Sequence, residues 1–96
     1  MILRPIERVY APLADQLAAR RAAGEWRVTL TFARVEALLG RPLPATACAG
    51  RHYRAWWGGL TNAPHAWYGW QRDGWTVEAV DLAAGTVTFA RPGGAG

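Results

Sequence analysis

The sequence predicts a small α+β domain in which helical segments alternate with short strands. Apolar residues recur at helical spacing in two segments, and they alternate with Thr or Glu in three others. Gly or Pro stands near the ends of most of these segments, as at turns. A chain of 96 residues is too short to divide its core in two, so we expect a single domain over residues 1–96.

The N-terminal part predicts a helix preceded by an arm. Residues 1–9 mix apolar and charged side chains without a regular period, so we expect an irregular arm there. A helix should follow over residues 11–24, because Pro12 suits a first helical turn and Leu13 and Leu17 lie four residues apart. The glycine at its last position should end it.

A strand and a second helix follow directly on one another. Residues 27–31 alternate between apolar and polar side chains, which is typical of a half-buried strand. Thr31 can cap a helix over residues 32–39, whose apolar residues form a stripe on one face. Gly40 should end this helix.

The middle of the chain predicts less regular structure and then a third helix. Residues 45–50 could form one helical turn, and residues 51–57 are expected to be extended. The third helix should cover residues 64–72, with Asn62 as its cap and Gly74 after its end.

The C-terminal part predicts a β-hairpin. Residues 75–79 and 86–89 alternate in polarity around a turn at residues 83–85, and a loose Gly-rich tail covers residues 92–96. The predicted order, three helices with a short first strand and a C-terminal hairpin, is that of a winged-helix-like domain. In such a domain the third helix enters the major groove of DNA.

The composition argues against several function classes. The chain has no Ser and no Lys, which excludes serine nucleophiles and the lysine-dependent phosphate loop. Cys48, His52 and His65 lack the paired spacing of zinc ligands, and no carboxylates form a close pair. We therefore expect no catalytic residue, no metal site, no cofactor and no enzymatic activity.

The expected location is the cytoplasm. The single cysteine cannot form an internal disulfide, and no N-terminal stretch has the pattern of a signal peptide. No apolar run approaches the roughly 18 to 20 residues that cross a bilayer, so no membrane association is expected.

Charge and aromatic residues favour an anionic partner. The net charge is +4, and between Gly50 and Trp75 three arginines face one acidic residue, Asp73. Arginine can bind phosphates, and aromatic rings can stack on unpaired bases. We expect a module that binds nucleic acid, in particular duplex DNA, through nine residues: Arg51, Arg54, Trp57, Asn62, His65, Trp67, Gln71, Arg72 and Arg91.

Their expected roles differ. The arginines should contact phosphates, with Arg91 acting beside the hairpin, and Gln71 is chemically suited to adenine. Of the six tryptophans, Trp56, Trp70 and Trp75 should fill the core, which leaves Trp57 and Trp67 exposed. The inclusion of Trp57 and Trp67 among the nine candidate residues depends on their being exposed.

The same residues also suit a protein interface. Exposed Trp, Tyr and Arg side chains are typical hot spots, so the alternative is a protein–protein interaction module in an operon-encoded complex. A second copy of the chain is another partner to consider. Phosphate binding should weaken steeply with salt, whereas an aromatic protein interface should change little.

Several short motifs resemble those of a small uncharacterised bacterial domain family. The resemblance extends from Tyr10 to Arg91, and it implies a domain without an established activity. The motifs are Leu30-Thr31-Phe32, Glu36-x-Leu38-Leu39-Gly40, Leu43-Pro44, Trp56-Trp57, Trp70-x-x-x-Gly74-Trp75 and Val87-x-Phe89-x-Arg91.

Overall fold

The computed structural model describes residues 5–49, 51, 53–58 and 63–92. This part of the chain is an α+β fold with five α-helices and a three-stranded antiparallel sheet, which confirms the predicted class. The helices include the three predicted ones, the helical turn expected within residues 45–50, and one further short helix. The elements are α1 (Pro5–Ala22), β1 (Arg27–Thr31), α2 (Phe32–Leu39), α3 (Ala45–Cys48), α4 (Tyr53–Gly58), α5 (Pro64–Gly69), the 3-10 helix η1 (Gln71–Asp73), β2 (Thr76–Asp81) and β3 (Thr86–Ala90).

α1 begins earlier than predicted. It starts at Pro5, so the prediction of an irregular arm over residues 1–9 is wrong from that residue onward. Proline suits the first position of a helix, where its missing N–H would have no helical partner. Pro12 lies inside α1 and forfeits one helical hydrogen bond, but burial of Tyr10 and Leu13 on either side favours a continuous helix.

The β1–α2 segment forms as predicted. The backbone N–H of Arg34 donates to Oγ1 of Thr31 over 3.0 Å, which makes Thr31 the N-cap of α2. At the other end Gly40 has φ of 73° and its N–H donates to the carbonyl of Glu36. This left-handed conformation suits glycine, and it ends α2 at the expected residue.

Residues 53–58 are helical, so the prediction of an extended segment over residues 51–57 is wrong there. The sequence of this segment has weak preferences, which tertiary contacts readily override. In α4 the ring of Trp57 is fully buried and packs against Phe32 and Phe89. Burial of this large ring is the physical reason for the helical conformation.

The third predicted helix is shorter than expected. α5 ends at Gly69, and residues 71–73 form the separate 3-10 helix η1. A Cβ at Gly69 would lie 3.3 Å from Cδ1 of Tyr10, so glycine permits close packing of α5 on α1. Ala63 precedes α5 without a side-chain cap, and the expected cap Asn62 lies outside the described residues.

The sheet has the strand order β1-β3-β2. The central strand β3 pairs antiparallel with both neighbours, so that Phe89 lies opposite Val28 of β1 and Val77 of β2. A β-bulge lies between Val77 and Ala79, where Glu78 is the extra residue. The short first strand and the hairpin therefore share one sheet.

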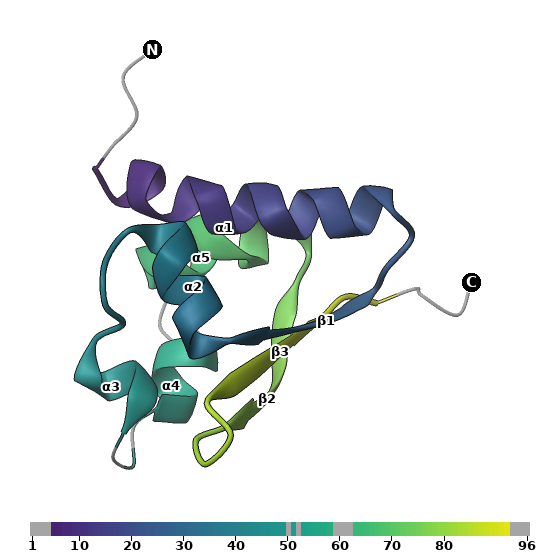
Figure 1. Cartoon of the computed structure of the whole chain (residues 1–96). Coiled ribbons are helices and arrows are strands. Elements are labelled where there is room, and N and C mark those ends of the chain that lie inside the picture. Colours follow the sequence, from purple (N-terminus) through teal and green to yellow (C-terminus); the bar gives the residue numbers. More distant parts are fainter. Residues whose placement is uncertain (1–4, 50, 52, 59–62, 93–96) are drawn as a thin grey trace.

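Helices and sheet enclose one hydrophobic core. Figure 1 shows α1, α2 and α5 over the sheet, with α3 and α4 beside the end that carries the β2–β3 turn. Trp70 and Trp75 are buried as predicted, whereas Trp56 is only partly buried. The largest fully buried side chains are Trp57, Trp70, Trp75, Phe89, Leu13, Leu17, Val35 and Val87.

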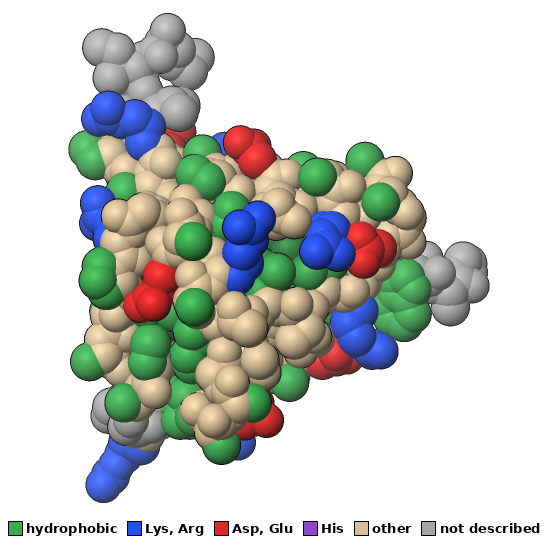
Figure 2. Space-filling view, viewed as in Figure 1, with side chains coloured by type: hydrophobic (Ala, Val, Ile, Leu, Met, Phe, Trp, Pro, Cys, Tyr) green, Lys and Arg blue, Asp and Glu red, His purple; other side chains and the backbone are tan. Residues whose placement is uncertain are grey.

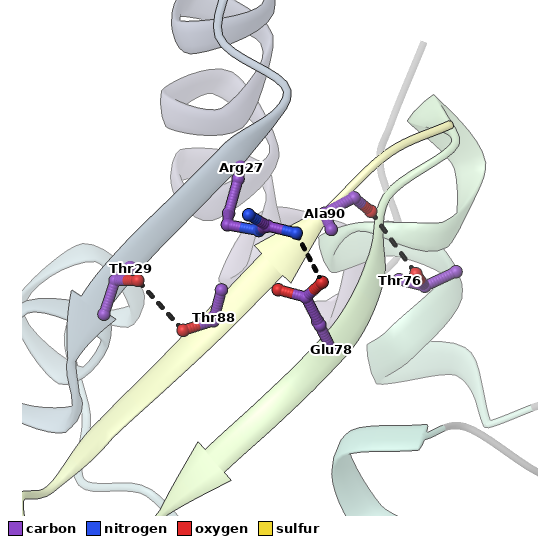
Figure 3. Close-up of polar contacts among 6 residues, drawn as sticks. All are labelled: Arg27, Thr29, Thr76, Glu78, Thr88 and Ala90. Carbon is purple, nitrogen blue, oxygen red and sulfur yellow. Dashed lines mark hydrogen bonds and ion pairs between the residues drawn. The ribbon is translucent and has the colours of Figure 1, made fainter. Parts of the chain in front are cut away.

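The opposite face of the sheet carries mainly small polar side chains. Arg27 reaches across β3 to Glu78, and Nη2 lies 2.8 Å from the carboxylate oxygen Oε1 (Figure 3). The hydroxyl groups of Thr29 and Thr88 share a hydrogen bond of 2.9 Å, while Thr76 donates to the carbonyl of Ala90. We call this surface the threonine face.

Candidate nucleic-acid interface

Trp57 is a core residue, so the prediction that it is exposed is wrong. Its side chain has no exposed surface, and its indole N–H donates to the carbonyl of Ala47 over 2.9 Å. The ring stacks on Phe32 at 5.9 Å and also packs against Trp70 and Phe89. A buried and hydrogen-bonded indole offers nothing for a nucleic acid to contact.

His65 is partly buried and bound to α4. Its ring lies 4.1 Å from the ring of Trp56 at an interplanar angle of 16°, and Nε2 lies 2.7 Å from the carbonyl oxygen of Trp56. Because a carbonyl only accepts, Nε2 must carry the proton. Burial lowers the pKa of His65 from 6.5, partly offset by this hydrogen bond, so the neutral ring is favoured.

Gln71 also makes an internal contact. Its Nε2 donates to the carbonyl of Gly58 over 3.2 Å, which connects η1 to the end of α4. The third residue expected to meet bases, Asn62, lies outside the described residues. The side chains of His65 and Gln71 therefore connect α4 to α5 and η1.

Three predicted arginines lie against aromatic rings. The guanidinium carbon of Arg54 lies 5.7 Å from the ring centroid of Tyr53, and that of Arg72 lies 5.6 Å from Tyr68. Arg91 lies in the same way 5.9 Å from Trp75. Each ring favours a cation above its face and restricts the guanidinium. Nε of Arg54 also donates to the hydroxyl of Tyr53 over 3.2 Å, which leaves its terminal N–H groups to donate elsewhere.

These arginines differ from those that are ion-paired. Within the described ranges, carboxylates pair with Arg20 and with Arg27 only, through Glu25 at 3.1 Å and Glu78 at 2.8 Å. Arg51 and Arg54 are exposed near the start of α4, and Arg72 is exposed on η1. Sequence reasoning identified these cations but not their aromatic supports, although neighbours such as Tyr53 and Arg54 were visible.

The arginines on the face shown in Figure 2 are dispersed. Figure 2 shows arginines separated from one another on the face in view, with acidic side chains between some of them. Arg54, Arg72 and Arg91 come from α4, η1 and the residue after β3, respectively. A ligand that uses all three must extend over several elements.

Trp67 is exposed, as predicted. It lies on α5 with 48% of its surface accessible, in contrast to the buried Ala66 beside it. Trp26, immediately before β1, is the other exposed large apolar residue of the described part, at 38%. Its exposure was not predicted, because residues before a strand carry no periodic signal.

A groove of about 420 Å³ separates α4 from β2. Tyr53 and Arg54 line one side, and Val77 and Val80 line the other. The fully buried Trp57 contributes to the lining from α4. The groove has the volume of a small-ligand site, and its charged lining residues are Arg54 from α4 and Glu78 from β2.

Other reactive groups are dispersed. No group of three His, Cys, Asp or Glu side chains within the described ranges is placed to hold a metal ion. Cys48 is partly buried, and burial together with the charge of Glu36 raises its pKa. The indole N–H of Trp75 is buried and has no acceptor in the part of the chain that the structure describes.

The fold and site define a small α+β domain with aromatic-supported surface arginines. The chain belongs to the family described as Domain of unknown function (DUF7662), whose model matches residues 10–92. This confirms the expected membership of an uncharacterised domain family over nearly the same residues. No curated protein and no solved structure matches the chain significantly.

None of the helices in the described ranges has both the length and the apolar character that a bilayer crossing requires.

Proposed function

We propose that the protein is a non-enzymatic module that binds nucleic acid, chiefly through phosphate contacts from Arg54, Arg72 and Arg91. The observation that carries the proposal is the aromatic support of these three cations, none of which is paired with a carboxylate among the described residues. Arg51, exposed beside α4, adds a fourth cation. A cytoplasmic location fits the single cysteine.

The aromatic support has an energetic consequence. A free arginine loses rotamer entropy when it binds a phosphate, and part of that loss has already occurred when its guanidinium rests on a ring. An arginine that is ion-paired must instead give up its carboxylate before it binds. Arg27 also lies over a ring, 4.9 Å from that of Trp26, but it is paired with Glu78. Arg54, Arg72 and Arg91 have ring support without a carboxylate partner among the described residues, which makes them the better phosphate ligands of this proposal.

The arrangement of elements supports a winged-helix-like use of this surface. α5 takes the place of the third helix, with exposed Trp67 on it and Arg72 just beyond it, and Arg91 ends the hairpin. Since the side chains of His65 and Gln71 already bond backbone carbonyls of α4, base recognition is a smaller part of the proposal than backbone contact. Duplex DNA is the proposed ligand, with binding that depends weakly on sequence.

The test is the salt dependence of binding to labelled duplex and single-stranded oligonucleotides. Fluorescence anisotropy at about 50 and 200 mM salt should show affinity falling by orders of magnitude if several phosphates are contacted. Arg54→Gln and Arg72→Gln should each weaken binding and reduce the logarithmic salt slope by about one. The matched control is Arg21→Gln, which removes the same charge from an exposed position on α1.

Two results would contradict the proposal. One is the absence of binding to either oligonucleotide form at the lower salt concentration. The other is an equal effect of the Arg21→Gln control, because the attraction would then come from net charge and not from the arginines that lie on rings.

The second candidate function is a protein–protein interaction module in an operon-encoded complex. The exposed ring of Trp67 favours it, since tryptophan is common among the residues that dominate binding energy. Trp67→Ala should then abolish binding to the partner protein, whereas high salt should leave that binding intact. If binding is lost at high salt but is unchanged in Trp67→Ala, the ligand is nucleic acid and not a protein.

A further inference from the structure

Among the described residues, no strand pairs with the outer edge of β1. β1 lies at one side of the sheet, and the N–H of Arg91 donates to Trp26 over 3.0 Å while that of Phe32 donates to Gly85 over 2.8 Å. Bonded and non-bonded residue pairs alternate along an antiparallel ladder. The backbone groups of Arg27, Thr29 and Thr31 must therefore point away from β3.

The two edges of the sheet differ in protection. β2 contains the bulge at Glu78 and has α4 beside it across the groove. β1 has no bulge and no proline over Arg27–Thr31, and its register with β3 is regular. Natural proteins usually block such an edge, because it can pair with a strand of another chain.

We propose that two copies of the chain pair antiparallel through β1, so that their sheets form one continuous sheet. The twofold axis passes beside Thr29, which lies opposite Thr29 of the second copy. Arg27 then lies opposite Thr31 of the other copy, and these positions are the ones whose backbone groups point outward. The proposal concerns β1 and is independent of the proposed nucleic-acid function.

Charge and chain direction select this register. A register centred on Arg27 would place two arginines directly opposite each other, which is unfavourable. A register centred on Thr31 would place the second copy opposite residues of α2, which have no strand conformation. Centring on Thr29 keeps the pairing within β1 and separates the two Arg27 side chains, each of which is also neutralised by Glu78.

The side chains beside the edge favour a second copy over an unrelated strand. Trp26 precedes β1 with 38% of its surface exposed, and Phe32 follows β1 as a partly buried residue. Trp26 and Phe32 flank the paired strand, one residue beyond each end of β1, so the proposed register brings Trp26 near Phe32 of the other copy at both ends of the interface. One chain thus supplies an exposed ring and its apolar counterpart, which is what a twofold interface requires.

The threonine face would extend across the dimer. Thr29 and Thr88 already form a cross-strand pair in each copy (Figure 3). Pairing about Thr29 would bring the two such pairs together on the same outer face, because residues in register share a face.

The experiment compares Thr29→Pro with Thr29→Val in the full chain. Both substitutions remove the hydroxyl that bonds Thr88, but only proline removes the outward N–H. Light scattering or sedimentation should give about twice the 10.5 kDa of one chain for the parent and for Thr29→Val, and a monomer for Thr29→Pro. A monomeric parent chain, or a Thr29→Pro dimer, would overturn the proposal.

Cysteine cross-linking keeps the test decisive if Thr29→Pro does not fold. In a Cys48→Ala background, Thr29→Cys places two thiols across the twofold axis, where Cα atoms about 5.5 Å apart permit a disulfide. The control Thr88→Cys lies on β3, so its two copies would be roughly 14 Å apart. Selective oxidation of Thr29→Cys to a linked dimer supports the proposal, and equal linkage or none contradicts it.

Discussion

The imidazole of His65 lies flat on the indole of Trp56 and also donates to the backbone carbonyl of that tryptophan. The ring centroids are 4.1 Å apart, and the hydrogen bond from Nε2 measures 2.7 Å. Since Trp56 belongs to α4 and His65 to α5, one side chain connects the two helices by both stacking and hydrogen bonding.

This contact predicts that the protein loses stability in mild acid. Burial lowers the pKa of His65 below 6.5, its ordinary value in the unfolded chain. Below that value the unfolded chain binds more protons than the folded protein, so the free energy of unfolding decreases as the pH falls toward the folded pKa. Urea denaturation at about pH 7.5 and pH 5.5 measures the effect.

The control for this prediction is His65→Gln. It removes the titrating group but retains His52, so the difference between the two proteins isolates His65. The stability of the parent should fall more between the two pH values than that of the variant. An equal decrease in both would show that His65 does not titrate differently on folding.

Trp57→Ala should strongly destabilise the fold. The substitution leaves a cavity among Phe32, Trp70 and Phe89 and removes the hydrogen bond to Ala47, at a cost of about 3 to 5 kcal/mol. Trp67→Ala on α5 is the matched control, because that ring is exposed. Denaturation that shows the same small change for both would contradict the assignment of Trp57 to the core.

Thr31→Ala should weaken the start of α2. The loss of the Oγ1 acceptor for the N–H of Arg34 should lower the free energy of unfolding by about 0.5 to 2 kcal/mol. Thr31→Ser keeps the acceptor and should recover most of this loss. If alanine and serine behave alike in chemical denaturation, the cap contributes little.

Cys48 should react slowly with alkylating agents. Burial and the negative charge of Glu36 raise its pKa, so less of the reactive thiolate is present at neutral pH than for a free cysteine. Mass spectrometry after iodoacetamide treatment should show slow modification of the folded protein and faster modification in denaturant. Similar rates in both conditions would contradict this prediction.

Local sequence signals predicted the elements that depend on few neighbours. The alternation of Val28 and Leu30 with threonines specified β1, and Thr31 and Gly40 specified both ends of α2, as the structure confirms. The conformation of residues 53–58 could not be predicted in the same way. Two adjacent tryptophans fit either helix or strand, and contacts of Trp57 with Ala47 and Phe89 decide between them.

Of the candidate site, only the positions of the exposed arginines could be predicted from the sequence. The basic excess around Arg54 and Arg72 could be read directly, because exposure is the usual state of arginine. Whether an aromatic or polar residue faces solvent depends on distant parts of the chain. His65 and Gln71 have polar groups that suit base recognition, but carbonyls of Trp56 and Gly58 accept their hydrogen bonds.

Because of the bulge at Glu78, β2 should tolerate the loss of one residue better than β3 does. Without Glu78, the remaining residues of β2 would alternate regularly, with Val77 and Val80 still directed to the core. A deletion of that one codon should therefore preserve the fold. The loss of one residue from β3, which has no bulge relative to β1, would exchange the two faces of part of the strand and turn Val87 or Phe89 toward solvent.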